Sequence, residues 1–495
     1  MLTQRAVKGA SWLLVGRLIS NAIGLISTIV VARLLLPADF GLVALGLSVL
    51  AIVSSLVELP TGTALIQLQD LKDDDFDTAW TLGILKGAAV CIAMIVAAWP
   101  VAVALKDQRL VGLMIMLSFY PVVLGIRNSY FENFARDMQF SREVILDVSS
   151  KVASFVGTVA FAYYFRSYWA LPLGQILSGV VASAMSFLLI PKRPKLSLKS
   201  FDRIFKFSAW LGASSMVLQL NWQADSLIVG RMLGPTSVGF LSVGGQVTTR
   251  INEVTSQPLF RSLFAAFSSI QNDTERLRRA YLSAQAMCVA ALLPVGLGLS
   301  AVAVPFISLC LGDKWRDTGT VVAFCGVTIA MMTLTGPSQA FSLAIGRTRT
   351  LFERDTLALI LRSPCLLIGI IAYQMTGLLI SLLVSTALLV GITAHMMSGF
   401  IGVSVIGQIA NCGRSIVSGV IMYAVAASIS GIAPLEGPFL IRAVMLGVVV
   451  GTGAVVYAAV HGLLWLIAGR PEGPEVKLFS ALAKARLKLA GVVAR

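Results

Sequence analysis

Residues 31–46 read VARLLLPADFGLVALG, and residues 225–244 read DSLIVGRMLGPTSVGFLSVG. In both stretches an apolar run ends in Arg-x-Leu, passes a proline and leads into a second apolar run that contains glycine. Shifting the chain by 198 residues superposes the two stretches without a gap and produces identities that include eleven pairs between residues 5 and 60 and their equivalents. They are Arg5/Arg203, Lys8/Lys206, Trp12/Trp210, Leu13/Leu211, Val31/Val229, Arg33/Arg231, Leu35/Leu233, Pro37/Pro235, Gly41/Gly239, Gly46/Gly244 and Pro60/Pro258. Uncommon residue types at a single offset indicate an internal repeat.

The composition around this repeat is that of a membrane protein. Of 495 residues, 57% are hydrophobic and only 13% are charged, against about 25% charged in ordinary soluble domains. The mean hydropathy is +0.85, which excludes a soluble enzyme, a secreted disulfide-rich domain and a disordered chain. Continuous apolar runs also exclude a β-barrel, whose strands alternate in polarity.

The apolar runs are long enough to cross a bilayer as helices, and they predict an all-α polytopic protein of about fourteen transmembrane helices. The predicted spans cover 10–34, 40–66, 80–105, 110–134, 148–165, 169–190, 207–231, 237–265, 281–307, 318–345, 351–373, 377–399, 414–432 and 439–467.

The charged residues between the spans predict the orientation. With a cytoplasmic N-terminus, twenty-five Lys and Arg residues lie in inner loops and termini and seven in outer loops. The positive-inside rule then places both termini in the cytoplasm. The repeat offset carries six spans, an even number, so the two halves have the same orientation, as in transporters with parallel repeats. The expected domains are a six-helix lobe at 1–190, a basic cytoplasmic linker at 191–206, a second six-helix lobe at 207–400, two additional helices at 401–468 and a cytoplasmic tail at 469–495.

Other classes of site find little support in the sequence. The net charge of +15 is spread over loops as an orientation signal rather than gathered for nucleic acid. The six cysteines are scattered without ligand spacing and the two histidines are too few for a metal centre, so we expect no metal. There is no G-x-x-x-x-G-K-[ST] loop for a nucleotide, and we expect no cofactor beyond a coupling proton or sodium ion.

The two repeated stretches resemble the helix–turn–helix segments of bacterial polysaccharide flippases. These flippases belong to the multidrug/oligosaccharidyl-lipid/polysaccharide exporter superfamily, and the resemblance is to the branch with colanic-acid and succinoglycan exporters. It covers essentially the whole chain. The resemblance implies two six-helix lobes in a V shape that work by alternating access, followed by two C-terminal helices. It also implies the function, which is to move undecaprenyl-pyrophosphate-linked oligosaccharide repeat units across the bacterial inner membrane for exopolysaccharide or lipopolysaccharide biosynthesis. No family motif supplies site residues.

The eighth predicted span carries one polar stripe. Its members recur at spacings of 4, 3, 4 and 4 residues, which at 100° per residue places them within an arc of about 80°. They are Gln246, Arg250, Glu253, Gln257 and Arg261. A single polar stripe on an apolar helix is typical of a cavity lining. The alternative is an Arg250–Glu253 pair that only holds helices together.

Further basic residues fall inside other spans, where a lipid-facing arginine costs about 2.5–3.5 kcal/mol. Arg17 and Asn21 share a face of the first span, Arg127 lies in the fourth and Arg362 in the eleventh. For Arg17 the alternative is a packing seam, and for Arg362 a structural ion pair. Basic residues exceed acidic ones in the spans, which predicts an electropositive cavity suited to pyrophosphate and acidic sugars.

Intramembrane carboxylates are typical sites of proton or sodium binding. The candidates for ion coupling are Glu58, Glu132, Asp225 and Glu253, and a structural pair with an arginine is the alternative for Asp225. The rival functions are a cation-coupled multidrug-type exporter, a peptidoglycan-precursor flippase and a membrane polysaccharide polymerase. The absence of a large outer loop disfavours the polymerase, and we expect no enzymatic activity.

The remaining expectations concern partners. The linker PKRPKLSLKSFDRIFK (191–206) is basic and broken by prolines, and we interpret it as a loop that anchors on anionic lipid. The tail over 476–495 predicts an amphipathic helix at the membrane surface, with docking of a synthesis partner, such as the polymerase or co-polymerase, as the alternative. The substrate is a lipid-linked oligosaccharide, and no nucleic acid is expected.

Overall fold

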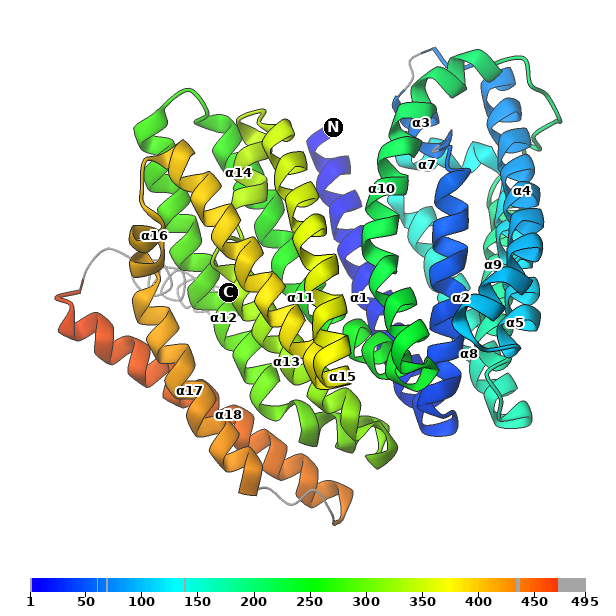
Figure 1. Ribbon diagram of the computed structural model, residues 1–495. Coiled ribbons are helices and arrows are strands. Elements are labelled where there is room, and N and C mark those ends of the chain that lie inside the picture. The colour runs from blue at the N-terminus through cyan, green and yellow to red at the C-terminus, as the bar shows by residue number, and fades with distance from the viewer. Residues whose placement is uncertain (1, 60, 68–69, 138, 433–436, 471–495) are drawn as a thin grey trace, which may run out of the picture. The chain divides into compact units, whose positions relative to one another are not determined.

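The computed structural model describes residues 2–59, 61–67, 70–137, 139–432 and 437–470, and every regular element in these ranges is a helix. The chain divides into two compact units, residues 1–243 and 244–495 (Figure 1). The first unit holds α1 (Leu2–Leu34), α2 (Pro37–Leu56), α3 (Thr61–Gln67), α4 (Asp73–Leu105), α5 (Arg109–Leu117), α6 (Phe119–Gly125), η1 (Ser129–Phe131), α7 (Glu132–Arg136), α8 (Phe140–Phe165), α9 (Ala170–Leu189), α10 (Phe201–Leu233) and the start of α11 (Pro235–Ser269). The second holds the rest of α11, α12 (Thr274–Leu311), η2 (Asp313–Trp315), α13 (Arg316–Thr333), α14 (Ser338–Ala344), α15 (Thr348–Ile401), α16 (Val405–Asn411), α17 (Gly413–Ile432) and α18 (Phe439–Ile467).

The structure confirms a polytopic helical membrane protein. Among the described residues nine helices are long and apolar enough to cross a membrane, and up to eleven if each of two bent helix pairs is one span. One of the nine is α15, whose 54 residues are interrupted at Tyr373 and Gln374, where φ and ψ leave the helical region. This break falls between the predicted spans 351–373 and 377–399. The long helices α10 and α11, which carry many polar residues, are not among the nine.

Three predicted spans are broken rather than continuous. The second ends with α2 at Leu56 and resumes only in α3. The fourth consists of α5 and α6, then a bend of 63° into η1 and α7, and the tenth bends by 40° between α13 and α14. Asn128 stabilises the first of these bends, because its side-chain oxygen accepts a hydrogen bond of 3.0 Å from the N–H of Tyr130. A hydropathy window does not detect such breaks, since it averages each short piece with the strongly apolar helix before it.

The two bent pairs occupy corresponding places in the two units. In the first unit α4 packs on α6, and a Cβ on Gly83 would lie 3.0 Å from the carbonyl oxygen of Gly125. In the second unit α12 packs on α13, and a Cβ on Gly296 would lie 2.7 Å from the carbonyl oxygen of Gly326. Each unit thus has a long helix that touches a bent partner through a glycine–glycine contact, although the glycines of the two units are not equivalent at the 198-residue offset.

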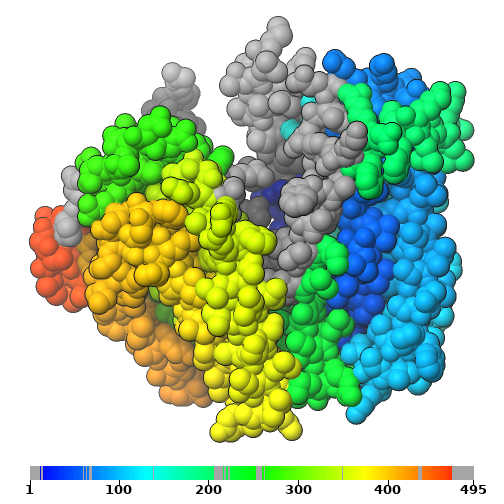
Figure 2. Space-filling model, turned by 45° about the horizontal axis from the view of Figure 1, so that its top comes forward, coloured from blue at the N-terminus to red at the C-terminus, as the bar shows by residue number. Residues whose placement is uncertain are grey.

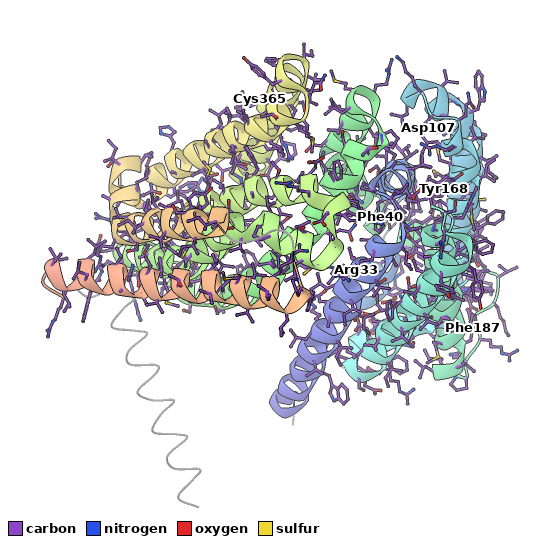
Figure 3. The ribbon with its side chains drawn as sticks, turned by 90° about the horizontal axis from the view of Figure 1, so that it is seen from below. Arg33, Phe40, Asp107, Tyr168, Phe187 and Cys365 are labelled. Atoms are coloured by element: carbon purple, nitrogen blue, oxygen red, sulfur yellow. The ribbon has the colours of Figure 1, made fainter. Side chains whose placement is uncertain are left out.

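The turns of the first unit alternate between its two ends. Asp107, Tyr168 and Phe40 lie together at the end seen in Figure 3. There the Asp107 carboxylate accepts a 2.7 Å hydrogen bond from the Arg109 guanidinium, which lowers the pKa of Asp107. At another set of turns Lys192 pairs with Asp73 at 2.5 Å, and Arg142 donates to the carbonyl of Leu189. The Arg109 guanidinium also lies within electrostatic range of Asp39 and Tyr168, so the turns after α1, α4 and α8 form one group. The contacts of Lys192 and Arg142 bring the chain after α9 to the starts of α4 and α8.

In the second unit, α17 and α18 pack against α12 (Figure 1). Two polar contacts fix α18 there. The Arg442 guanidinium donates to Ser308 Oγ at 2.8 Å, and the hydroxyl of Tyr457 donates to the carbonyl of Ala290 at 2.8 Å. The predicted tail helix over 476–495 lies outside the described residues.

Candidate functional site

The polar centre of the first unit forms where α6 ends and the chain bends. Arg127 follows the end of α6, and its Nη2 lies 3.7 Å from Oε1 of Glu132 on α7. The guanidinium also stacks over the Phe131 ring at 4.6 Å. Both charged side chains are partly buried, at 34% and 26% exposure. A Cβ on Gly62 would lie 3.3 Å from the Glu132 carboxyl carbon, so α3 covers this pair from one side.

Helix α8 adds two carboxylates that the sequence analysis missed. Glu143 and Asp147 are four residues apart, so they lie on one face. Glu143 lies within electrostatic range of Asp147, Glu132, Arg127 and Arg17. The prediction began the fifth span at residue 148, whereas α8 begins at Phe140. The signal that could have found them is the helical spacing of Glu143, Asp147 and Lys151, which continues the α8 pattern toward its start.

Helix α1 reaches this centre because it packs closely on α8. A Cβ on Gly16 would lie 2.6 Å from the Val144 side chain. Arg17 follows Gly16 in α1, and Glu143 precedes Val144 in α8. Asn21, one turn beyond Arg17, is half-buried. Arg17, Arg127 and Glu132, three of the predicted site residues, thus all lie within electrostatic range of Glu143.

This first-unit cluster is balanced in charge. Its acidic members are Glu132, Glu143 and Asp147, and its basic members are Arg17, Arg127 and Lys151, the last within electrostatic range of Asp147. The count of in-span residues predicts an excess of positive charge, but that count omits the two carboxylates of α8. Guanidinium groups beside exchangeable carboxylates can bind an anion and can also respond to a proton or a cation.

Glu58 lies apart in a different ion pair. It follows the end of α2, and its Oε2 lies 2.6 Å from Lys86 Nζ on α4, with both side chains somewhat over a quarter exposed. Lys86 neutralises its charge within the first unit. Asp225, on α10, is half-buried.

In the second unit, Gln246 and Arg250 lie one turn apart on α11, exposed and half-buried respectively. Between them Thr248 is buried and bonds to Cys325 of α13, which is within electrostatic range of Arg362 on α15. The structure thus places Arg362 at the meeting of α11, α13 and α15. The side chains of Glu253, Gln257 and Arg261 lie outside the described residues, although α11 continues through all three positions. No group of three or more His, Cys, Asp or Glu residues suited to a metal occurs in the described parts of the chain.

A family model described as "Polysaccharide biosynthesis protein" matches residues 30–320. The chain belongs to this family. It is 27% identical over 384 residues to the lipopolysaccharide biosynthesis protein WzxC of Escherichia coli K12, covering 76% of this chain and 77% of that protein. It is 21% identical over 348 residues to the succinoglycan biosynthesis transport protein ExoT of Rhizobium meliloti, covering 70% of each.

Solved structures show the same fold. The lipid II flippase MurJ in an inward closed conformation matches with a TM-score of 0.69 at 12% identity, over 94% of this chain and all of that one. An inward-facing multidrug resistance transporter of the MATE family matches with a TM-score of 0.53 at 16% identity, over 82% of this chain and 94% of that one. At these identities the likeness concerns the fold.

Proposed function

We propose that this protein moves undecaprenyl-pyrophosphate-linked oligosaccharide repeat units from the cytoplasmic to the outer leaflet of the bacterial inner membrane. The observation that carries the proposal is membership of the polysaccharide biosynthesis family over residues 30–320, joined to a multi-spanning helical fold. The protein is a transporter of lipid-linked polysaccharide repeat units and not an enzyme, in keeping with its relatives WzxC and ExoT.

The mechanism that we propose is alternating access of two six-helix lobes in a fourteen-span protein. Its structural support is the repeated order of a long helix and a bent pair in both units. Arg17 and Arg127 of the first unit, and Arg250 and Arg362 of the second, would hold the pyrophosphate and acidic sugars. Gln246, Gln257 and Arg261 would extend that path along α11, and Asn21 along α1. A guanidinium offers a planar fork that matches phosphate and carboxylate oxygens.

The energy for outward transport would come from a proton or sodium ion. Glu143 and Asp147 are the candidates that we favour, because Glu143 lies within electrostatic range of Arg17, Arg127 and Glu132, and Asp147 within range of Arg127. An ion that binds these carboxylates would free the arginines for the substrate anion. When the ion leaves, the carboxylates would pair with the arginines again and displace the substrate. Asp225 and Glu253 remain proposed carriers in the seventh and eighth spans. Glu58 is the weaker candidate, since Lys86 already neutralises it at 2.6 Å.

The test of the function uses purified protein in vesicles that contain a fluorescent pyrophosphate-linked repeat unit. We expect the label to cross the bilayer only in vesicles with protein and a proton or sodium gradient. Efflux of cationic dyes without movement of the labelled lipid would make the protein a multidrug-type exporter. Movement of lipid II at the same rate would make it a peptidoglycan-precursor flippase.

A prediction about coupling follows from the α8 carboxylates. The substitutions Glu143→Gln and Asp147→Asn are expected to slow gradient-driven transport by roughly tenfold or more, equivalent to about 1.4 kcal/mol or more in the barrier. The matched control is Glu353→Gln, because Glu353 is a well-exposed member of a surface pair with Arg349. Asp225→Asn and Glu253→Gln are measured in the same assay. Variants at 143 and 147 that respond to the gradient like the unchanged protein would remove both residues from coupling.

A prediction about topology follows from the basic loops. An impermeant maleimide added to intact cells is expected to label a cysteine at Asp313 and not one at Ser197, because the positive-inside rule places the basic connection after α9 in the cytoplasm. Labelling is compared before and after permeabilisation, with total protein as the control. Labelling of Ser197→Cys in intact cells would reverse the proposed orientation.

A further inference from the structure

The connection between α9 and α10 is an extended segment whose backbone is bound by side chains of α4. Three of its N–H groups donate to acceptors in the first turns of that helix. The N–H of Lys195 bonds to Asp77 Oδ1 at 2.9 Å, that of Ser197 to Thr81 Oγ1 at 3.0 Å, and that of Ser200 to Thr78 Oγ1 at 3.2 Å. We call residues 191–200 the strap. Figure 2 shows it in green against the blue end of α4. The lipid contact that its lysines predict concerns side chains and stays a prediction.

The acceptors are inside the protein. Asp77, Thr78 and Thr81 are between 0% and 8% exposed. A buried acceptor that loses its partner keeps the full cost of its desolvation, so the three bonds favour the bound strap more than contacts made in water would. The spacing of Asp77, Thr78 and Thr81 gives one helix face the acceptors for an extended chain.

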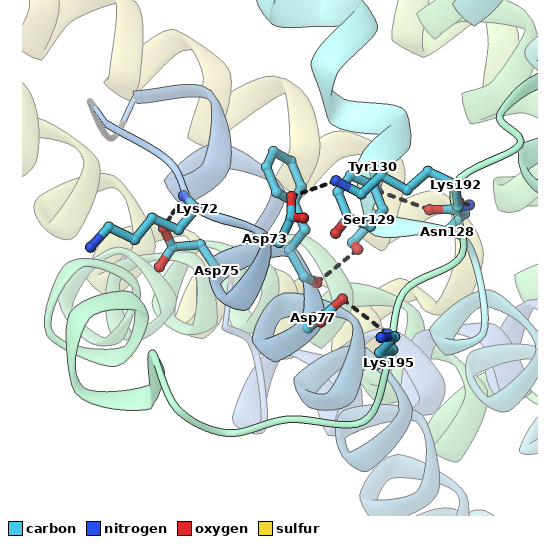
Figure 4. Close-up of polar contacts among 10 residues, drawn as sticks. Lys72, Asp73, Asp75, Asp77, Asn128, Ser129, Tyr130, Lys192 and Lys195 are labelled. Atoms are coloured by element: carbon cyan, nitrogen blue, oxygen red, sulfur yellow. Dashed lines mark hydrogen bonds and ion pairs between the residues drawn. The ribbon is translucent and has the colours of Figure 1, made fainter.

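Further contacts hold both ends of the strap, and Figure 4 shows those at its start. At its start, the amide of Asn128 donates to the Lys192 carbonyl at 2.8 Å, and Lys192 Nζ pairs with Asp73 and lies 4.6 Å from the centre of the Tyr130 ring. The Asp73 carboxylate raises the pKa of Lys192, so the lysine stays charged. Beyond its end, Arg203 pairs with Asp75 at 3.2 Å, where Asp75 is only 1% exposed on its side chain.

The strap fixes the start of α10 on the first unit. Ile204, in the first turn of α10, is fully buried in a cluster with Phe76, Ala79 and Leu82 of α4. The other end of α10 packs on α2, where a Cβ on Gly230 would lie 2.4 Å from the Leu45 side chain. In the sequence repeat, however, α10 corresponds to α1 and opens the second half.

We propose that the strap stays clasped to α4 throughout the transport cycle, so that α10 moves with the first unit although the repeat assigns it to the second half. The inference rests on the proposed transport function. The alternative is a tether that must leave α4 whenever the two halves of the repeat rearrange. A strap that stays bound predicts that a covalent bond between strap and α4 leaves transport intact. A tether that must be released predicts that the same bond stops transport.

The first experiment joins strap and helix by a disulfide. Thr81→Cys and Ser197→Cys are introduced together, oxidised in vesicles, and the bond is quantified by mass spectrometry. We expect high yield and a transport rate within about twofold of the same sample after reduction. A crosslinked protein that transports tenfold slower and recovers with reductant would overturn the proposal, and so would failure of the two cysteines to join. The single Thr81→Cys variant controls for the loss of the hydroxyl.

The second experiment releases the strap. Asp77→Ala removes the acceptor for Lys195, and trypsin in inside-out vesicles is expected to cut the strap roughly tenfold faster, as loss of about 1.4 kcal/mol would allow. Asp77→Asn keeps an acceptor oxygen and is expected to resist. Asp74→Ala is the matched control, because the pair that Asp74 forms with Lys199 of the strap is long, at 3.7 Å, and exposed to solvent. Cleavage does not depend on transport, so equal rates for Asp77→Ala and Asp74→Ala would overturn the strap while leaving the proposed function intact.

Discussion

Replacing Gly41 with leucine is expected to abolish export of the polymer. Gly41 lies in the first turns of α2, where this helix crosses the first turns of α11. A Cβ at Gly41 would lie 1.6 Å from the carbonyl oxygen of Pro235, far inside any real contact. The obstacle is backbone, so no change of rotamer relieves it. Overpacking of this kind costs about 1–3 kcal/mol even where side chains can shift, and here we expect the upper end of that range or more.

The same contact occurs with the two helices exchanged, so a second substitution is expected to have the same effect. A Cβ at Gly239 would lie 2.0 Å from the carbonyl oxygen of Pro37, and Gly239 and Pro235 are the repeat equivalents of Gly41 and Pro37. Gly239→Leu is therefore expected to be as damaging as Gly41→Leu. Helix backbones this close can form Cα–H···O contacts, as between small residues in membranes.

The measurement is polymer export in a deletion strain together with thermal stability of the purified protein. Gly447→Leu in α18 is the matched control, because nothing lies within 4 Å of a Cβ at that position. We expect Gly447→Leu to export normally. Wild-type export from both Gly41→Leu and Gly239→Leu would show that the helices do not approach as closely as the structure has them.

The second large effect is expected at Arg250. If its guanidinium binds the pyrophosphate in a low-dielectric path, its charge-assisted hydrogen bond is worth about 1.5–3 kcal/mol. Arg250→Ala should then slow export by roughly tenfold to a hundredfold. Arg250→Lys should restore part of the rate, because lysine keeps the charge and loses the planar fork.

A purely structural role for Arg250 predicts another pattern. If Arg250 only pairs with Glu253, then Arg250→Ala lowers the amount of protein, and the exchange Arg250→Glu with Glu253→Arg restores both amount and export. Export is therefore normalised to membrane protein for each variant, with Arg261→Ala measured alongside. The matched control is Arg349→Ala, whose side chain is 90% exposed. Normal export from well-expressed Arg250→Ala and Arg261→Ala proteins would refute the cationic path.

Several features of the protein were predictable because they depend on local composition. A run of twenty apolar residues crosses a bilayer as a helix whatever surrounds it, and the long helices α4, α8, α9, α12, α17 and α18 follow the predicted spans. The identities at one offset predicted the repeat, and the two bent pairs fit it. The family followed from the Arg-x-Leu…Pro…Gly pattern and is now established by the match over residues 30–320.

Features that depend on where a helix begins or breaks were not predictable in this way. Averaging over a window hides the bend after Gly125 and the early start of α8 at Phe140. Because the early start of α8 was not predicted, Glu143 and Asp147 were not counted among the residues inside the spans. The balanced charge of the first-unit cluster was therefore missed as well. Arg127 and Glu132 were both predicted as site residues, but only the bend between them shows that they form a pair.

The sequence by itself determined the class of this protein, its repeat and its family, because hydropathy, periodicity and motif spacing are properties of neighbouring residues. Only the tertiary structure decided what the basic connection after α9 does. Its lysines favoured lipid as a partner, yet its backbone binds Asp77, Thr78 and Thr81, which precede it by more than a hundred residues. No local sequence pattern predicts that an acceptor on one helix pairs with a donor in a loop far along the chain. They meet because α4 and α9 place their ends side by side, and burial then makes their hydrogen bonds strong enough to hold the chain.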